Sequence, residues 1–237
     1  MLNNLAQESP RVPDQKIRAV IFDLDGTLLD TAPDFVVVVN QLLTERDQPT
    51  LAPETIRTTV SNGARGLISL AFGIDEKHSD FPELRQRLLD IYSNHLAVYT
   101  QPFPGMMELL HDLDQRGIYW GLATNKPFAY TEPLMAALNL QPEPVTVICP
   151  DHVEQRKPHP ESLLLAAKHV GCLPEEIIYV GDHKRDIDCG RQAGSITIAA
   201  GYGYIEPEDD INTWEADYRA DSVAELRSII EQLLINQ

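Results

Sequence analysis

Short apolar runs recur along the chain, and polar residues bound each of them. The first run covers residues 17–23 and is rich in β-branched side chains. Runs of this length and composition are typical of strands that are buried on both faces of a parallel sheet. Four further runs predict strands at residues 118–123, 145–149, 177–180 and 196–200.

Segments with apolar residues at helical spacing separate these predicted strands. In residues 106–116, leucine and methionine side chains repeat at intervals of three and four, and Gly117 follows as a C-terminal cap. Similar patterns predict helices at residues 128–138, 161–170, 185–193 and 223–234. Alternating strands and helices predict the α/β class, with a parallel sheet and right-handed crossovers.

One long segment, residues 31–103, interrupts this alternation. It has helical patterns and no convincing strand, and Pro33 fits the first turn of its first helix. Further helices are expected at residues 53–60, 66–72 and 82–99. We therefore predict an all-helical domain at residues 31–103 inside an α/β core made of residues 17–30 and 104–237. Residues 1–16 are polar and predict a flexible tail.

The charge of the chain narrows its possible partners. Its 237 residues include 36 acidic and 19 basic side chains, which gives a formal net charge of −17. Such a surface repels nucleic-acid phosphates and anionic lipid headgroups, so we expect neither a nucleic-acid nor a membrane partner. A small anionic substrate remains possible if the protein provides a local positive site.

The cysteines and the apolar runs bear on the compartment. Cys149, Cys172 and Cys189 are widely spaced and odd in number, which predicts free thiols in a reducing compartment. The first residues contain no apolar segment of the kind found in signal peptides. No apolar run approaches the roughly 20 residues of a membrane span. We therefore expect a cytoplasmic protein.

Polar clusters follow four of the predicted strands. Ligands of open parallel sheets bind at the carboxyl ends of the strands, so these clusters predict one shared site. The residues there whose side chains are best suited to catalysis or metal binding are Asp23, Asp25, Thr124, Lys157, Asp182 and Asp186. Two carboxylates about 4 Å apart repel each other by about 4 kcal/mol at an effective dielectric constant near 20. A divalent cation together with Lys157 would offset this repulsion, and all-oxygen ligands favour Mg²⁺.

Position along the chain suggests a role for each of these residues. Asp23 ends its strand and is expected to act as the nucleophile, and Asp25 as the acid and base on the other side of the reacting phosphoryl group. Thr124 would bind phosphate oxygens, and Lys157 would offset charge on both the phosphate and the nucleophile. Asp182 would complete a metal site with Asp23 and Asp25, and Asp186 would join that site or orient water or Lys157.

Four further residues are candidates for substrate binding. Asn125 and Lys126 follow Thr124 directly, and Gly63 and Arg65 lie in the helical segment. Arg65 would meet a substrate carboxylate, although an ordinary surface charge is the alternative. For Lys126 the alternatives are contact with phosphate and exposure to solvent.

The motifs at residues 23–27, 124, 157 and 181–186 together resemble those of phosphatases of the haloacid dehalogenase superfamily. The resemblance implies a Rossmann-like core with strand order 5-4-1-2-3 and a helical cap inserted after the first strand. It also implies Mg²⁺ bound by Asp23, the backbone carbonyl of Asp25, and Asp182. His183 differs from the small or acidic residue that is common at its position. Two roles are open for it: a neighbour of the metal ligands, or a ligand itself.

Longer stretches narrow the resemblance. DLDGTLLDTAPDF at residues 23–35, ATNKP at 123–127 and RKPHPE at 156–161 resemble the phosphoglycolate phosphatase group. Residues 60–65, 148–153 and 202–209 resemble bacterial phosphatases of N-acetylmuramic acid 6-phosphate, which implies a role in peptidoglycan recycling.

The expected activity is therefore Mg²⁺-dependent hydrolysis of a small phosphomonoester through an aspartyl phosphate. N-acetylmuramic acid 6-phosphate is the first choice of substrate, and 2-phosphoglycolate is the alternative. A dehalogenase, a sugar phosphomutase and a non-catalytic binding protein of the same fold are the other possibilities. Asp25 favours phosphoryl transfer to water over the dehalogenase. The protein is expected to be a monomer or a homodimer.

Overall fold

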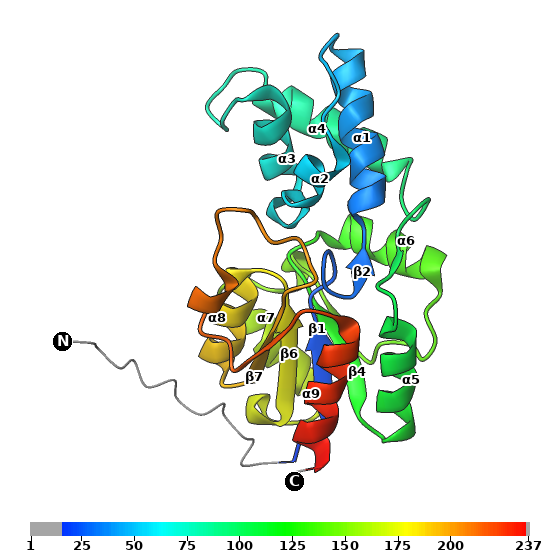
Figure 1. The fold of residues 1–237 in the computed structure, drawn as a ribbon, viewed down its shortest axis with the longest axis vertical. Coiled ribbons are helices and arrows are strands. Elements are labelled where there is room, and N and C mark those ends of the chain that lie inside the picture. Colours follow the sequence, from blue (N-terminus) through cyan, green and yellow to red (C-terminus); the bar gives the residue numbers. More distant parts are fainter. Residues whose placement is uncertain (1–15, 236–237) are drawn as a thin grey trace, which may run out of the picture.

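A parallel sheet with helices on both faces and a separate layer of helices make up the described part of the chain, residues 16–235 of a computed structural model (Figure 1). Within this range the larger sheet has six strands in the order β5-β4-β1-β6-β7-β8, and each neighbouring pair is parallel. The strands are β1 (Ala19–Phe22), β4 (Tyr119–Ala123), β5 (Val147–Ile148), β6 (Ile177–Gly181), β7 (Ile196–Ala200) and β8 (Tyr218–Ala220). The predicted α/β class is confirmed.

The order of the strands agrees with the expected order and extends it by one strand. Numbered along the chain, the five predicted strands lie in the order 5-4-1-2-3. The additional strand, β8, pairs with β7 at the edge of the sheet. It has three residues, of which one is exposed and one half-buried, so its hydrophobic pattern is too short to predict a strand.

The central strand β1 is covered by helices on both faces, which explains its continuous apolar run. Val20 and Phe22 belong to one core cluster, which includes residues of α5 (Met106–Gln115) and α9 (Val223–Ile235). Ala19 and Ile21 belong to a second cluster with residues of α7 (Glu161–Val170) and α8 (Lys184–Ala193). Because side chains alternate along a strand, each face of β1 buries every second residue. Helix α6 spans Phe128–Leu138.

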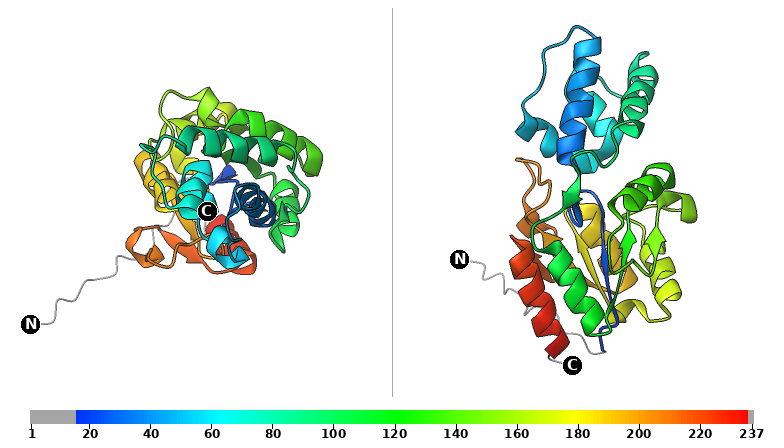
Figure 2. Two further views of the ribbon diagram at one scale, coloured as in Figure 1. Left: turned by 90° about the horizontal axis from the view of Figure 1, so that it is seen from above. Right: turned by 90° about the vertical axis from the view of Figure 1, so that its right-hand side faces the viewer.

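The helical layer contains α1 (Ala32–Glu45), α2 (Pro53–Arg57), the 3-10 helix η1 (Val60–Asn62), α3 (Gly63–Phe72) and α4 (Phe81–Ser93). This layer lies beyond one end of the large sheet, as the side view in Figure 2 shows. The chain enters through β2 (Leu29–Asp30) and returns through β3 (Gln101–Pro102), which pair as an antiparallel ladder. The expectation that residues 31–103 contain no strand is therefore wrong at the return segment, where β3 is only two residues long.

The last helix of this layer is shorter than predicted. Residues 82–99 were expected to be helical, whereas α4 ends at Ser93. The Asp34 carboxylate accepts hydrogen bonds from the backbone N–H groups of Tyr99 and Thr100 and from the Thr100 hydroxyl, at 2.6–3.1 Å. These contacts fix a non-helical backbone near the start of β3, and helical periodicity in the sequence does not reveal them.

Three further expectations concern the N-terminal tail, the cysteines and membrane spans. Residues 1–15 of the predicted tail lie outside the described residues. Cys149, Cys172 and Cys189 are free thiols, as expected. Among the described helices, none has the length and apolar character needed to cross a membrane.

Candidate active site

Three buried carboxylates meet at the carboxyl end of the sheet. Asp23 directly follows β1, Asp182 directly follows β6, and Asp186 lies in the first turn of α8. Each offers an oxygen atom, and these atoms lie within 4.8 Å of one another. The parallel pairing of β1 and β6 brings their ends together, so this edge of the sheet gathers residues far apart in the sequence.

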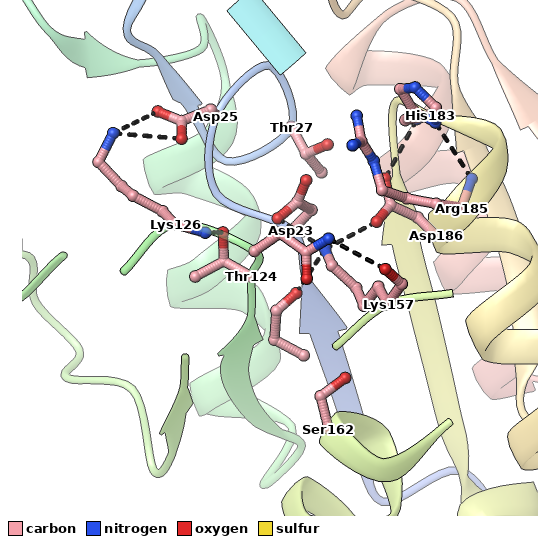
Figure 3. Close-up of polar contacts among 12 residues, drawn as sticks. Asp23, Asp25, Thr27, Thr124, Lys126, Lys157, Ser162, His183, Arg185 and Asp186 are labelled. Carbon is pink, nitrogen blue, oxygen red and sulfur yellow. Dashed lines mark hydrogen bonds and ion pairs between the residues drawn. The ribbon is translucent and has the colours of Figure 1, made fainter. Parts of the chain in front are cut away.

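Lys157 connects two of the carboxylates. Its Nζ atom lies 2.9 Å from Asp23 Oδ1 and 2.7 Å from Asp186 Oδ1, and its side chain is 1% exposed (Figure 3). The ammonium also donates to the carbonyl of Ala123 and to the Tyr179 hydroxyl, both at 2.9 Å. Burial lowers the pKa of Lys157, but Asp186 and Asp23 outweigh that effect and raise it. Asp23, Asp182 and Asp186 together form an acidic group, and Lys157 is a fixed cation within it.

The acidic group carries more negative charge than Lys157 balances. Burial, with repulsion from Asp23 and Asp186, raises the pKa of Asp182 to about 7. Burial also raises the pKa of Asp186 to about 6, although Lys157 opposes the shift. Asp23 is likewise buried, but Lys157 lowers its pKa below the usual value. When all three carboxylates are ionised, the single ammonium leaves two negative charges, which favours binding of a cation.

The donor set fits Mg²⁺. Three carboxylates supply hard oxygen ligands, which suit this ion.

Two glycines allow the backbone to approach the Asp182 side chain closely. A Cβ atom at Gly26 would lie 2.0 Å from Asp182 Oδ2, and one at Gly203 would lie 2.3 Å from Asp182 Cβ. Gly26 also has a φ of +81°, in the region that favours glycine. Asp23, Asp182 and Asp186 are therefore the residues that could hold the metal.

Asp25 lies apart from these carboxylates. Its two carboxylate oxygens are 3.0 and 3.2 Å from Lys126 Nζ (Figure 3). The Lys126 side chain is 5% exposed, and its ammonium lies 4.7 Å from the ring centroid of Tyr92 and 5.2 Å from that of Phe35. The predicted convergence of four carboxylates is thus found for three of them. Lys126 attracts the Asp25 side chain instead, and it is not the solvent-exposed lysine of the alternative interpretation.

Thr124 and Asn125 organise the loop after β4. Thr124 is buried, and its hydroxyl accepts a hydrogen bond from the backbone N–H of Lys126 at 3.1 Å. The Asn125 amide donates to the backbone carbonyl of Lys157 at 3.1 Å. These contacts hold the β4 loop against the segment that carries Lys157.

The structure does not bring Arg65 to the acidic group. Its guanidinium pairs with Glu76 at 2.9 Å, and both side chains are more than half exposed. Gly63 begins α3 with a φ of +65°, and a Cβ atom added there would meet no other atom within 4 Å. In this arrangement Arg65 has the role of a surface charge, which was the alternative to contact with substrate.

Three hydrogen bonds of η1 at the carboxyl end of the sheet were not predicted. The Ser61 hydroxyl, in η1, donates to Asp182 Oδ2 at 2.9 Å, and Arg185 Nη2 donates to the backbone carbonyl of Ser61 at 2.6 Å. The neighbouring Asn62 donates to Glu206 at 2.8 Å. Residues 60–65 stood out in the sequence only through resemblance, because the partners of Ser61 and Asn62 lie more than 100 residues away.

A second junction joins the helical layer to the sheet. Arg57, in α2, donates to both carboxylate oxygens of Asp30 at 2.8 and 2.9 Å. The Tyr204 hydroxyl donates to Asp30 at 2.8 Å and accepts the backbone N–H of Ala32 at 2.9 Å. Asp30 and Ala32 flank the point where the chain passes from β2 into α1. Sequence reasoning missed this role of Arg57 and Tyr204.

His183 caps a helix in this structure. Its Nδ1 atom accepts the backbone N–H of Arg185 at 3.1 Å, at the N-terminus of α8. Burial and the charge of Arg185 lower the pKa of His183 to about 4, so the imidazole is neutral near pH 7. Among the described residues His183 is not part of the acidic group, which agrees with a neighbouring role rather than that of a ligand.

The fold and the order of these motifs define a known class of protein. The family model of haloacid dehalogenase-like hydrolases matches residues 20–200. The chain belongs to this family. A crystal structure of a predicted phosphoglycolate phosphatase from Haemophilus somnus 129PT has the same fold, with a TM-score of 0.79 and 24% identity over 92% of this chain and 99% of that one.

Curated relatives of this chain are phosphatases. N-acetylmuramic acid 6-phosphate phosphatase of Pseudomonas putida is 45% identical over 92% of this chain and 98% of its own length. The phosphatase of the same name from Pseudomonas aeruginosa is 41% identical over 92% of this chain and 97% of its own length. Phosphoglycolate phosphatase of Xanthomonas campestris is 39% identical over 84% of this chain and 90% of its own length. These similarities place the chain among phosphoric monoester hydrolases.

Proposed function

We propose that the protein is a Mg²⁺-dependent phosphatase whose substrate is N-acetylmuramic acid 6-phosphate. The observation that carries the chemistry is the meeting of Asp23, Asp182 and Asp186 around Lys157 at the carboxyl end of the sheet. The choice of substrate is supported by 45% identity, across almost the full length of both chains, to a phosphatase named for it. This function implies a role in peptidoglycan recycling.

The reaction would proceed in two steps. In the first, a carboxylate oxygen of Asp23 attacks phosphorus, the ester P–O bond breaks, and the proton of the Asp25 carboxyl passes to the leaving oxygen. In the second, water attacks the aspartyl phosphate and returns a proton to Asp25, so that phosphate leaves and Asp23 is restored. In this structure the Asp25 carboxylate pairs with Lys126 at 3.0 Å. The first step needs Asp25 in its protonated form and the second step needs it as the carboxylate.

The other residues would prepare these steps. Lys157 holds Asp23 in its ionised form and offsets charge on the incoming phosphate. The Thr124 hydroxyl and neighbouring backbone N–H groups are candidate donors to phosphate oxygens. Asp23, Asp182 and Asp186, with the backbone carbonyl of Asp25, would hold Mg²⁺. When bound, the ion would offset negative charge on the carboxylates and on the substrate phosphoryl group.

A second candidate substrate is 2-phosphoglycolate. It is supported by the 39% identity to the Xanthomonas campestris phosphoglycolate phosphatase. Both candidates combine a phosphate ester with a carboxylate on the leaving group, so they belong to one chemical class. Release of halide from haloacids would favour the dehalogenase instead, and formation of an isomeric sugar phosphate would favour the phosphomutase.

A phosphate-release assay tests the proposal. The wild type should release phosphate from N-acetylmuramic acid 6-phosphate faster than from 2-phosphoglycolate and common sugar phosphates, and excess chelator should stop the reaction until Mg²⁺ is added. Asp23→Asn should lower kcat by about 10³-fold or more, because it removes the nucleophile. Asp114→Asn, at an exposed site in α5, is the matched control and should retain full activity. Normal turnover by Asp23→Asn would refute the mechanism, and activity in chelator would remove the metal from it.

A further inference from the structure

Arg185 is a cation at the junction of the helical layer and the acidic group. It lies in the first turn of α8, and its side chain is partly buried. Nη2 donates to the backbone carbonyl of Ser61 at 2.6 Å. Among the described residues, its guanidinium makes no other hydrogen bond and no ion pair with a carboxylate, although its charge acts on Asp23 and Asp186. Most of its N–H groups thus remain available to a ligand.

The surroundings of Arg185 connect it with the reaction site. Asp186 follows Arg185 directly and Asp182 lies three residues before it, and both belong to the acidic group. In Figure 3 its guanidinium extends from α8 toward Thr27. Ser61, the acceptor of Arg185, also donates to Asp182 Oδ2. The guanidinium is therefore held where the helical layer meets the site.

The other arginines near this junction are already paired. Arg57 contacts both carboxylate oxygens of Asp30, and Arg65 faces Glu76 at the surface. A guanidinium offers five donors in a planar fork that matches a carboxylate. In a chain with a net charge of −17, a substrate with a second anionic group needs such a local cation.

We propose that Arg185 binds the carboxylate of the substrate's leaving group and thereby determines specificity for carboxylate-bearing phosphate esters. This inference rests on the proposed phosphatase function and adds a residue to it. Ser61 orients the guanidinium through its backbone carbonyl, and Lys157 remains the cation of the phosphoryl site. Arg185 thus takes the role that the sequence suggested for Arg65.

Two pairs of substrates, each with and without a carboxylate, isolate the contribution of that group to recognition. N-acetylmuramic acid 6-phosphate differs from N-acetylglucosamine 6-phosphate by the lactyl ether that carries the carboxylate. In the same way, 2-phosphoglycolate carries a carboxylate where 2-hydroxyethyl phosphate has an alcohol. The ratio of kcat/KM within each pair measures how strongly the enzyme recognises that group.

The variant Arg185→Gln should lower kcat/KM for the carboxylate-bearing member of the hydrolysed pair by about 10- to 100-fold, mainly through KM, as expected for loss of hydrogen bonds to a charged group. The partner without the carboxylate should change by less than about 3-fold. Arg185→Lys keeps the charge without the fork and should recover part of the selectivity. Arg191→Gln is the control, because Arg191 lies on the same helix and pairs with Glu215 at the surface.

The outcomes separate this inference from other roles of Arg185 and from the proposed function. If Arg185→Gln slows both members of a pair equally, Arg185 only holds Ser61 or balances charge, and the inference is wrong. A wild type without preference inside either pair also overturns it. A wild type that hydrolyses none of the four esters contradicts the proposed function itself. Should Arg185→Gln fail to fold, a loss of selectivity in Arg185→Lys supports the inference, and unchanged selectivity there refutes it.

Discussion

Single side chains in the acidic group combine burial with like charge. Asp182 is 1% exposed, and its carboxylate receives hydrogen bonds from the Ser61 hydroxyl and from the backbone N–H of Tyr204. These donors favour the ionised form, but burial and the neighbouring carboxylates outweigh them. The group therefore holds its charge most readily when a further cation is bound.

This balance predicts a pH dependence of stability in metal-free protein. The pKa of Asp182 is about 7 in the folded state against an ordinary value of 3.8, so folded protein retains a proton that unfolded protein releases in this window. The contribution of Asp182 to the free energy of unfolding should therefore decrease as the pH rises from about 4 to 7. Mg²⁺ binds the ionised carboxylates, so its stabilising effect should increase over the same window.

Thermal unfolding in chelator and in Mg²⁺, at pH values between 5 and 8, measures both effects. Asp182→Asn removes the titrating group and is the control, because the difference between the two proteins isolates its contribution. A metal-free wild type that gains stability relative to Asp182→Asn with rising pH would contradict the prediction.

Among the structural elements, the loop that follows β7 contacts both the acidic group and the start of the helical layer. Its Tyr204 hydroxyl binds both Asp30 and the backbone of Ala32, and the Arg57 guanidinium lies 4.8 Å from its ring centroid. Tyr204 N–H also binds Asp182. One loop of the core therefore supports both the acidic group and the start of the helical layer.

Tyr204→Phe tests this role of the loop. Removal of the hydroxyl leaves the buried N–H of Ala32 without its acceptor, so the free energy of unfolding should decrease by about 1–3 kcal/mol. Tyr119→Phe is a suitable control, because Tyr119 is 46% exposed, and its effect should stay within about 0.5 kcal/mol. Denaturant unfolding measures both changes. Equal stability of the two variants would show that the Tyr204 hydroxyl contributes nothing.

At the scale of the molecule, the described residues form an α/β core and the helical layer, which meet at a narrow junction (Figure 2). Apart from β2 and β3, the two parts are connected by polar contacts of Ser61, Asn62 and Arg57 and by a ring contact between Tyr92 of α4 and Tyr130 of α6. The same molecule carries a net charge of −17. Its surface ion pairs are exposed and contribute little each. Self-repulsion is therefore the larger electrostatic effect at low ionic strength.

The net charge predicts that salt stabilises the protein. An increase in NaCl from 0.01 to 0.3 M shortens the screening length from about 30 Å to less than 10 Å and weakens repulsion across the molecule. The midpoint of thermal unfolding in chelator should rise by a few degrees. Scanning calorimetry in the two buffers measures the change. A lower midpoint at high salt would mean that the exposed ion pairs outweigh the repulsion.

Much of the fold was predictable because its signals are local. The apolar run before Asp23 and the helical spacing after Gly105 predict elements, and the alternation of elements predicts a parallel sheet. Once the sheet is parallel, its topology places Asp23 and Asp182 at one edge. The short strands β3 and β8 were missed because two or three residues show no recognisable period.

What the sequence by itself determined is thus the order of elements and the set of residues at the carboxyl end of the sheet. Only the tertiary structure decided which side chains meet: Asp25 pairs with Lys126, Arg65 turns to Glu76, and Arg185 reaches Ser61. Periodicity reports which face of an element is buried, because burial depends on neighbours along the chain. The pairing of charges between distant segments depends instead on side-chain direction and local burial, which exist only after the chain has folded.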